Sequence, residues 1–304
     1  MKPPLVSIVT INYNQTKVTE ECINSLHKIT YPNFEIIVVD NASSEDASIL
    51  KKLYPNVTLI LSKENLGFSG GNNLGINKSN GDFILFLNND TEVDRSFLEP
   101  LVNIFQEKKD VGLACSKLVY YGTEIIQYAG STNINPFTGR SKRIGFKQNN
   151  SELFSKSYLT DLPHGAAMMI SRKVLNKVGL MPEVFFLYYE EVDWAESIKK
   201  HGYNIWFVGH STVFHKESMS TGKNSTLKTY FLNRNRILYL RRNTSGLVKL
   251  FWIIFYILVS IPKNILIMMM KNEFNHLRVY LKAIAWNLSN KPKEHISKPA
   301  YLIK

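Results

Sequence analysis

The chain has 304 residues, of which 44% are hydrophobic and 20% are charged, as is typical of a globular protein with a substantial core. Its two cysteines, Cys22 and Cys115, are far apart and belong to no CxxC or Cys/His cluster, which argues against a disulfide framework and a zinc site. The N-terminal residues lack the basic segment, long apolar run and cleavage site of a signal peptide, so we expect a cytoplasmic location.

The net charge of +12 is concentrated towards the C-terminus. Residues 215–304 contain 16 Lys and Arg but only 3 Asp and Glu, whereas residues 1–214 are close to neutral. The same region includes residues 247–270, an almost unbroken apolar run. Basic residues interleaved with aliphatic ones favour an anionic membrane surface as the partner, and disfavour nucleic acid, which requires a polar basic face and stacking aromatics.

Short apolar runs alternate with helical patterns over the first hundred residues. This alternation predicts βαβ units with right-handed crossovers, and hence an α/β fold with a mixed, mainly parallel sheet flanked by helices. The predicted strands cover residues 6–11, 34–39, 57–61 and 83–87, and the predicted helices cover 17–29, 47–53, 69–77 and 97–107.

After residue 110 the pattern is less regular. Residues 130–157 are polar and irregular, and we expect a mobile loop or lid there. We predict an α/β domain over residues 1–224 and a basic, apolar helical region over residues 225–304. Further strands are predicted at 113–120, 125–128, 166–171, 204–208 and 212–215, and further helices at 173–178, 190–201, 227–242 and 274–288.

Polar residues follow three of the predicted strands, in the segments 12–14, 40–43 and 88–91. In parallel α/β sheets ligands bind beyond the carboxyl ends of the strands, so these segments are expected to meet at one edge. Asp40 could accept hydrogen bonds from a ribose or base, or cap a helix. Asp90 could anchor Mg²⁺ or Mn²⁺ on a substrate phosphate, or be a solvated turn residue.

Residues 65–73, Asn-Leu-Gly-Phe-Ser-Gly-Gly-Asn-Asn, lie between a predicted strand and a predicted helix. Glycines allow the backbone to pass close to a ligand, and a helix N-terminus favours an anion such as a diphosphate. A tight turn without a ligand would give the same pattern.

Glu190, Glu191 and Asp193 open a predicted helix directly after the aromatic run 185–189. Acidic residues in a first helical turn can simply complement the helix dipole. A carboxylate beside aromatic side chains is also partly desolvated, which raises its pKa towards the value that a general base needs. His215 ends a predicted strand, where it could ligate a metal or serve a structural role.

In their order along the chain, the segments 6–14, 38–43, 65–73, 87–91 and 189–193 resemble family 2 glycosyltransferases, with the rhamnosyltransferase-like branch as the most similar. The match extends over roughly residues 5 to 240. This resemblance implies a GT-A fold and an inverting transfer of a sugar from a nucleoside diphosphate donor. By analogy the donor is dTDP-rhamnose and the acceptor a glycan or lipid-linked glycan in cell-surface polysaccharide synthesis.

The resemblance also implies roles for individual residues. Asp90 and His215 would hold Mg²⁺ or Mn²⁺ on the diphosphate, and Glu191 would deprotonate the acceptor hydroxyl. The acceptor side would be lined by His164, Glu190 and Trp194. The nucleotide sugar would be bound by Thr10, Asn12, Tyr13, Asp40, Asn41, Asn72 and Asn89.

Two positions depart from the family pattern. The segment Asn88-Asn89-Asp90 lacks the first carboxylate of the Asp-x-Asp metal motif that many relatives carry. At the base, Glu190-Glu191 stands where many relatives have Glu-Asp, so Glu190 and Asp193 remain alternatives to Glu191.

Two other classes of protein would share a nucleotide site. A sugar nucleotidyltransferase should have a Gly-rich basic loop directly after the first strand, where this chain has Asn12-Tyr13-Asn14-Gln15. A non-catalytic sugar-nucleotide-binding protein would not need Asp90, Glu191 and His215.

Residues 247–270 are barely long enough to span a bilayer. Pro262, Lys263 and Asn264 are expected to break the run in two, and a lysine at mid-bilayer would cost on the order of a few kcal/mol. We therefore favour an interfacial or re-entrant helix pair at the cytoplasmic face of the membrane over a spanning helix or a buried one, in a protein that could form a homodimer. Lipid phosphates or an acceptor diphosphate would meet Arg234, Arg236, Arg241, Arg242, Lys249, Lys263, Lys271, Arg278 and Lys282.

Overall fold

The computed structural model describes residues 2–216 and 225–291. Within these residues ten strands form one sheet, and they are β1 (Val6–Asn12), β2 (Phe34–Asp40), β3 (Thr58–Leu61), β4 (Phe83–Leu87), β5 (Thr91–Val93), β6 (Val111–Tyr120), β7 (Ile126–Tyr128), β8 (Ser157–Thr160), β9 (Ala167–Ser171) and β10 (Asn204–His215). Their order is β3-β2-β1-β4-β9-β6-β10-β5, with β7 beside β6 and β8 beside β10.

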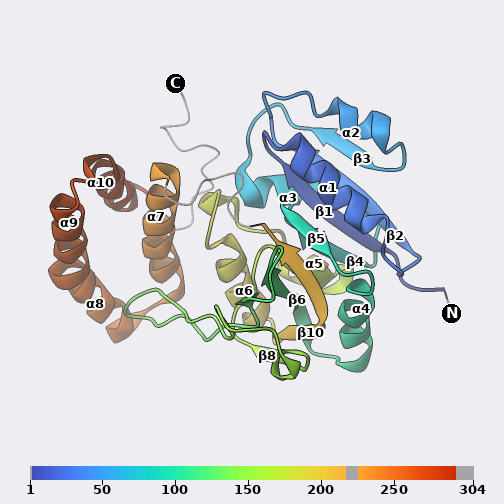
Figure 1. The fold of residues 1–304 in the computed structure, drawn as a ribbon. Coiled ribbons are helices and arrows are strands. Elements are labelled where there is room, and N and C mark those ends of the chain that lie inside the picture. The colour runs from blue at the N-terminus through green and yellow to red at the C-terminus, as the bar shows by residue number, and fades with distance from the viewer. Residues whose placement is uncertain (1, 217–224, 292–304) are drawn as a thin grey trace.

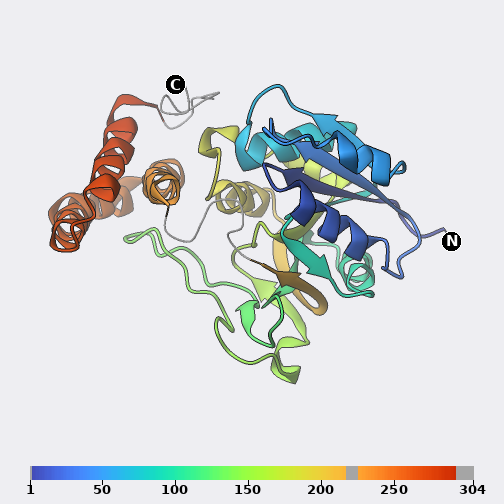
Figure 2. The same ribbon diagram turned by 45° about the horizontal axis from the view of Figure 1, so that its top comes forward.

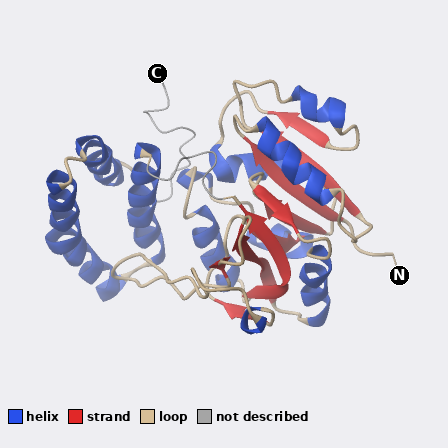
Figure 3. Ribbon diagram, viewed as in Figure 1, coloured by secondary structure: helices blue, strands red, loops and turns tan. Residues whose placement is uncertain are grey.

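Helices cover both faces of this sheet, and a group of helices at the C-terminal end lies to one side of it (Figures 1 and 3). The helical elements are α1 (Thr16–Leu26), α2 (Ser48–Leu53), α3 (Gly67–Lys78), α4 (Leu98–Glu107), η1 (Glu152–Phe154), α5 (Arg172–Val178), η2 (Glu183–Phe185), α6 (Glu190–Lys200), α7 (Thr226–Asn243), α8 (Gly246–Phe255), η3 (Tyr256–Ser260), α9 (Ile261–Met270) and α10 (Phe274–Ser289).

The predicted α/β fold is confirmed. Strands β3, β2, β1 and β4 are mutually parallel, and β2 and β4 are apolar and almost wholly buried, as expected for strands covered on both faces. The sheet is mixed because β9 runs antiparallel between β4 and β6. Residues 204–215 form one strand with a register shift between Val208 and Thr212, where the sequence indicated two strands.

Close packing of α3 on the sheet depends on a glycine. A Cβ atom at Gly75 would lie 2.3 Å from a methyl carbon of Val9 in β1. The missing side chain lets α3 approach β1, and so fixes the position of the glycine-rich segment 65–73 at the carboxyl ends of the strands.

The apolar run at the C-terminal end forms one continuous helix from Gly246 to Met270, so the expected break at Pro262 is wrong. The π-turn η3 ends at Ser260, two residues before the proline. Its wider turn relieves the conflict between the proline ring and the carbonyl one turn earlier, so the helix continues. Among the described residues this helix alone is long and apolar enough to cross a membrane, and only 6% of its most apolar window is buried.

Helix α7 packs against the α/β body, and the helix formed by α8, η3 and α9 lies on the side far from the sheet (Figures 1 and 2). Val184 and Phe185 share a hydrophobic cluster with α7 and α8. Arg234 is 1% exposed, so the expectation that it meets lipid phosphates is wrong. The predicted domain boundary at residue 224, and the chain end beyond residue 291, lie outside the described residues.

Candidate active site

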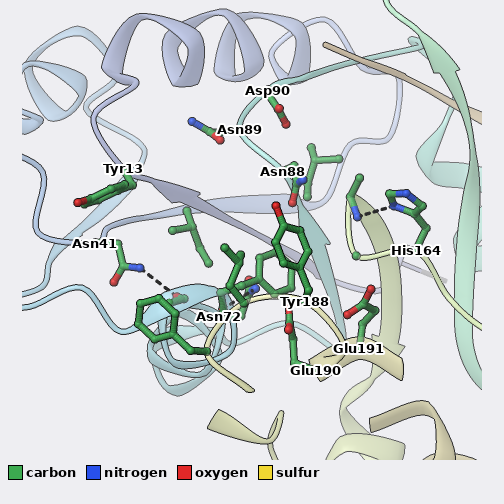
Figure 4. A pocket seen from close by; sticks show the side chains of 18 of the residues that line it. Tyr13, Asn41, Asn72, Asn88, Asn89, Asp90, His164, Tyr188, Glu190 and Glu191 are labelled. Carbon is green, nitrogen blue, oxygen red and sulfur yellow. Dashed lines mark hydrogen bonds between the residues drawn. The ribbon is translucent and has the colours of Figure 1, made fainter. Parts of the chain in front are cut away.

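A cavity of about 360 Å³ opens at the carboxyl ends of β1, β2 and β4. Figure 4 shows Glu190 and Glu191 on one side of it, Tyr13 and Asn41 on another, and Asn89 with Asp90 at a third. The predicted site residues that line it are Tyr13, Asn41, Asn72, Asn89, Asp90, His164, Glu190, Glu191 and His215. The strand-end rule correctly predicted that Tyr13, Asn41, Asn89 and Asp90 meet at one edge of the sheet.

Three predicted nucleotide ligands lie behind the cavity wall. Asn12 donates to Asp40 Oδ1 over 2.7 Å, and the hydroxyl of Ser43 donates to the same oxygen over 2.6 Å. These bonds tie the ends of β1 and β2 together beneath Tyr13 and Asn41. Thr10 is fully buried in β1, and its hydroxyl has no hydrogen-bond partner among the described residues.

Trp194 also lies away from the cavity. It is 1% exposed, its indole N–H donates to the carbonyl of Gly179 over 3.0 Å, and its ring packs edge-on against Phe86. Asp193, one of the alternatives for the base, pairs with Arg242 at 2.9 Å and does not line the cavity. The acidic side chains of α6 that line the cavity are therefore Glu190 and Glu191.

Asn41 anchors the glycine-rich segment. Its amide donates to the carbonyl of Gly67 over 2.9 Å and to Asn65 over 3.0 Å, and its side-chain oxygen accepts from the N–H of Leu66. Gly67 has a φ of 69°, and a Cβ atom there would lie 2.2 Å from the carbonyl oxygen of Phe186. The residue must therefore be glycine, because any side chain would displace the segment that leads into α6.

Asp90 and His215 meet although 125 residues separate them, because β10 pairs with β5. His215 Nε2 lies 3.0 Å from Asp90 Oδ1, and both side chains are less than 10% exposed. On the other side of the ring, His215 Nδ1 lies 2.7 Å from Gln127 Oε1. The side-chain oxygen of glutamine only accepts, so Nδ1 carries a hydrogen, and in the neutral ring Nε2 presents a lone pair.

These atoms fit a hard divalent cation. Carboxylate oxygen is a ligand of both Mn²⁺ and Mg²⁺, and the imidazole nitrogen suits the transition metal Mn²⁺ better than Mg²⁺. A ligating histidine usually donates its other N–H, as His215 does to Gln127. Residues 2–216 and 225–291 contain no group of three or more His, Cys, Asp or Glu side chains placed to share an ion. A cation bound by Asp90 and His215 would therefore keep positions for phosphate oxygens and water. Gln127 was missed from the sequence because it carries no motif.

Burial raises the pKa values of Glu190 and Glu191. It raises the pKa of Glu191 to about 7, and burial together with the charge of Glu191 raises the pKa of Glu190 well above its usual range. Glu190 is 3% exposed, and the Oε2 atoms of both residues have no hydrogen-bond partner among the described residues. A carboxylate with a pKa near 7 can take a proton from a hydroxyl group at neutral pH.

The burial of Glu190 should make the free energy of unfolding depend on pH. Because its pKa is raised in the folded state, folding is favoured at low pH, and that stability is lost as the pH rises past the unfolded value of about 4.3 towards the folded value. We expect Glu190→Gln to raise Tm at pH 8 and not at pH 4, each kcal/mol being worth about 2–4 °C. Differential scanning calorimetry would measure this, with exposed Glu152→Gln as the control. An equal gain at both pH values would contradict it.

His164 stays neutral. Burial is the main cause that lowers its pKa, to about 3. Its Nδ1 accepts a hydrogen bond of 3.2 Å from the N–H of Ala166, so the hydrogen of the ring is on Nε2. His164 is thus an uncharged hydrogen-bond donor at the cavity wall.

Comparison of the sequence with known proteins identifies relatives of this chain. Residues 7–179 match the family model for glycosyl transferase family 2. The chain is 28% identical over 244 residues to the low-salt glycan biosynthesis hexosyltransferase Agl10 of Haloferax volcanii, which covers 77% of this chain and 74% of that protein. It spans 58% of the length of the uncharacterised glycosyltransferases that it matches in Rickettsia typhi and Rickettsia prowazekii.

Solved structures share the fold. The chain superposes with a TM-score of 0.60 on GalNAc-T7 with UDP, GalNAc and Mn²⁺, at 17% identity, over 82% of this chain and 54% of that one. The TM-score is 0.55 with the mannosyltransferase PcManGT of Pyrobaculum calidifontis in complex with GDP-Man and Mn²⁺, at 16% identity, over 95% of this chain and 76% of that one. These likenesses confirm the predicted GT-A architecture.

Proposed function

The chain belongs to glycosyl transferase family 2, and from this premise we propose that its cavity transfers a hexose from a nucleoside diphosphate donor to an acceptor hydroxyl, with inversion at the anomeric carbon. The observation that carries the proposal is the placement of the Asp90–His215 pair and the buried carboxylate of Glu191 around one cavity. The Asp90–His215 pair could bind a cation on the leaving diphosphate, and the Glu191 carboxylate could accept the proton of the attacking hydroxyl.

Glu191 acts as the general base in this proposal. The acceptor oxygen forms a bond to the anomeric carbon while its proton passes to the carboxylate of Glu191. The bond from the anomeric carbon to the diphosphate oxygen breaks, and its electron pair leaves with the nucleoside diphosphate. The neutral His164 would donate a hydrogen bond from Nε2 to a sugar hydroxyl, without a charge that would compete with the base.

Asp90 and His215 would hold the divalent cation. When bound, Mn²⁺ or Mg²⁺ would neutralise the charge that grows on the diphosphate. The nucleoside side of the cavity would be formed by Tyr13, whose side chain is 39% exposed, and by Asn41. Thr10, Asn12 and Asp40 would act from behind this wall, by holding the ends of β1 and β2 in place.

Donor choice is best approached by direct comparison of substrates. We propose dTDP-rhamnose as the first candidate, on the resemblance of the motifs, and a glycan or lipid-linked glycan as the acceptor. Purified protein would be assayed for release of nucleoside diphosphate from dTDP-rhamnose, UDP-sugars and GDP-sugars, with Mn²⁺, Mg²⁺ or EDTA. Cation-dependent turnover of one donor would support the proposal, whereas absence of nucleotide affinity by calorimetry would refute it.

We propose that the protein lies at the cytoplasmic face of a membrane, and the exposed apolar surface of the C-terminal helices supports the membrane association in this proposal. The continuous helix of α8, η3 and α9 exposes Phe251, Ile257 and Leu258 by 54%, 57% and 69%. The start of this helix adjoins a second cavity, whose basic lining residues include Arg241 and Lys249. Large exposed apolar side chains next to basic ones complement the tails and phosphates of an anionic lipid surface.

Membrane association should depend on this apolar face. We expect Phe251→Glu combined with Leu258→Glu to weaken binding to anionic lipid vesicles at least about tenfold, because each buried side chain contributes on the order of 1.5–3 kcal/mol. Vesicle co-sedimentation would measure the loss. Leu159→Glu, which changes a leucine of β8 that is 55% exposed, is the control. Unchanged binding of the double variant would contradict the proposal.

A further inference from the structure

The segment that leads into α6 has an unusual backbone. Phe186, Tyr188 and Tyr189 have φ values of 64°, 68° and 73°, in the left-handed region that residues other than glycine rarely adopt. Such a conformation persists only where the surrounding structure holds it. Because Tyr189 is the residue directly before α6, the path of this segment sets where Glu190 and Glu191 point.

An asparagine of α7 holds the segment. The side-chain amide nitrogen of Asn235 lies 2.9 Å from the carbonyl oxygen of Phe185, and 2.7 Å from those of Leu187 and Tyr188. Asn235 is completely buried and does not line the cavity. Its amide is oriented by Arg234, whose Nε donates to Asn235 Oδ1 over 2.7 Å. Since a guanidinium only donates, the Asn235 atom that faces it is the oxygen, and the nitrogen faces the three carbonyls.

Arg234 binds the beginning of the same segment. Its NH2 group donates to the carbonyls of Val184 and Phe185 over 2.6 and 2.7 Å. The guanidinium lies 4.5 Å from the ring centre of Trp286 in α10, and the Asn287 amide donates to the carbonyl of Arg234 over 2.9 Å. Helix α10 therefore supports the part of α7 that binds the segment.

The opposite side of the segment is bound by the glycine-rich region, where Phe68 N–H donates to the carbonyl of Phe186 over 2.6 Å. Each carbonyl from residue 184 to residue 188 thus has a donor, and four of the five receive it from Asn235 or Arg234. A buried carbonyl without a donor is costly, so loss of Asn235 would favour another path for the segment.

We propose that Asn235 is a positioning residue that holds residues 184–189 in the conformation that presents the Glu191 carboxylate to the acceptor hydroxyl. The inference rests on the proposed transferase function. It makes α7 part of the catalytic apparatus, although the helix follows the residues that match the family model.

The test compares two asparagines of the same helix. Asn235→Ala removes the donor to the carbonyls of Leu187 and Tyr188, while the carbonyl of Phe185 keeps its bond from Arg234. A base displaced by about 1 Å can lose on the order of 10²-fold in rate. We expect kcat for sugar transfer to fall by about that factor, with KM for the donor within about twofold of the wild type, because Tyr13 and Asn41 are untouched. Asn235→Asp keeps the shape of the side chain but directs an oxygen at the carbonyls, and should lose as much.

Asn233→Ala is the matched control. Asn233 is partly buried, and its amide donates to the carbonyl of Thr229, one turn earlier in α7. Removing it deletes an asparagine and a hydrogen bond from the same helix without touching residues 184–189, so kcat should stay close to that of the wild type. Hydrogen–deuterium exchange of residues 184–191 should rise in Asn235→Ala and not in Asn233→Ala.

Each outcome decides the matter. An unchanged kcat in Asn235→Ala would overturn the inference, as would a loss of nucleotide affinity as large as the loss of kcat, which would show a general role in folding. If the wild type transferred no sugar, the proposed function would fail instead, and exchange would still decide the role of Asn235. Unchanged exchange at residues 184–191 would then overturn it.

Discussion

Glu191→Gln should lower kcat for sugar transfer by roughly 10²- to 10⁴-fold while leaving donor binding almost unchanged. Glutamine keeps the size of the side chain but cannot accept the proton of the acceptor hydroxyl. Initial rates of nucleoside diphosphate release with acceptor would give kcat, and calorimetry would give the affinity for the nucleoside diphosphate. A variant that binds as the wild type does and turns over at the same rate would exclude Glu191 as the base.

The pH dependence provides a second readout of the same residue. Glu191 must be ionised to act as a base, and its pKa is about 7, so the wild-type kcat should rise with pH to half its maximum near pH 7. Glu191→Gln should lose this rise. Glu190→Gln serves as the comparison, because Glu190 lies in the same cavity and is the remaining candidate. If Glu190→Gln had the lower kcat and its kcat no longer rose with pH, Glu190 and not Glu191 would be the general base.

Asp90→Asn should remove the stimulation by Mn²⁺ and lower kcat/KM by roughly 10²- to 10³-fold, the usual cost of losing a group that stabilises transition-state charge. Asparagine preserves the shape of the site but removes the negative charge beside His215. The measurement is a titration of activity and of nucleotide affinity with Mn²⁺, for wild type and variant, after treatment with EDTA.

The matched control for this prediction is Asp94→Asn. Asp94 follows β5, four residues after Asp90, and accepts hydrogen bonds from the exposed Ser96 without lining the cavity. It should keep the Mn²⁺ response of the wild type. Full activity of the wild type in EDTA, or a normal Mn²⁺ response in Asp90→Asn, would show that no cation acts through this pair.

The parallel half of the fold could be predicted because its signals are local. Strands β1, β2 and β4 are rich in apolar residues and are followed by polar ones, and sheet topology then places those polar residues together. The antiparallel insertion of β9 and the short strands β5 and β8 could not be predicted. Pairing partners depend on contacts distant in sequence, and the sequences of β5 (Thr-Glu-Val) and β8 (Ser-Tyr-Leu-Thr) contain no apolar run that would indicate a strand.

The residues that line the cavity could be predicted where they belong to a motif, as Asp90 and Glu191 do. Gln127 and Asn235 carry no such signal, since each acts on another residue through a hydrogen bond set by tertiary packing. Trp194 was assigned to the acceptor side by the resemblance alone. Its side chain is 1% exposed, packs in the core and does not line the cavity.

The arrangement of α7 bears on how a soluble form of this protein should be made. Shortening the chain at residue 225 would remove the exposed apolar helix, but also the side chains that bind the carbonyls of residues 184, 185, 187 and 188. The truncated protein would keep the strand-end residues that line the cavity, but Glu191, the proposed base, would lose the contacts that hold the segment before it. Solubility is better sought by replacing outward-facing residues such as Phe251 and Leu258, with α7 and α10 left in place.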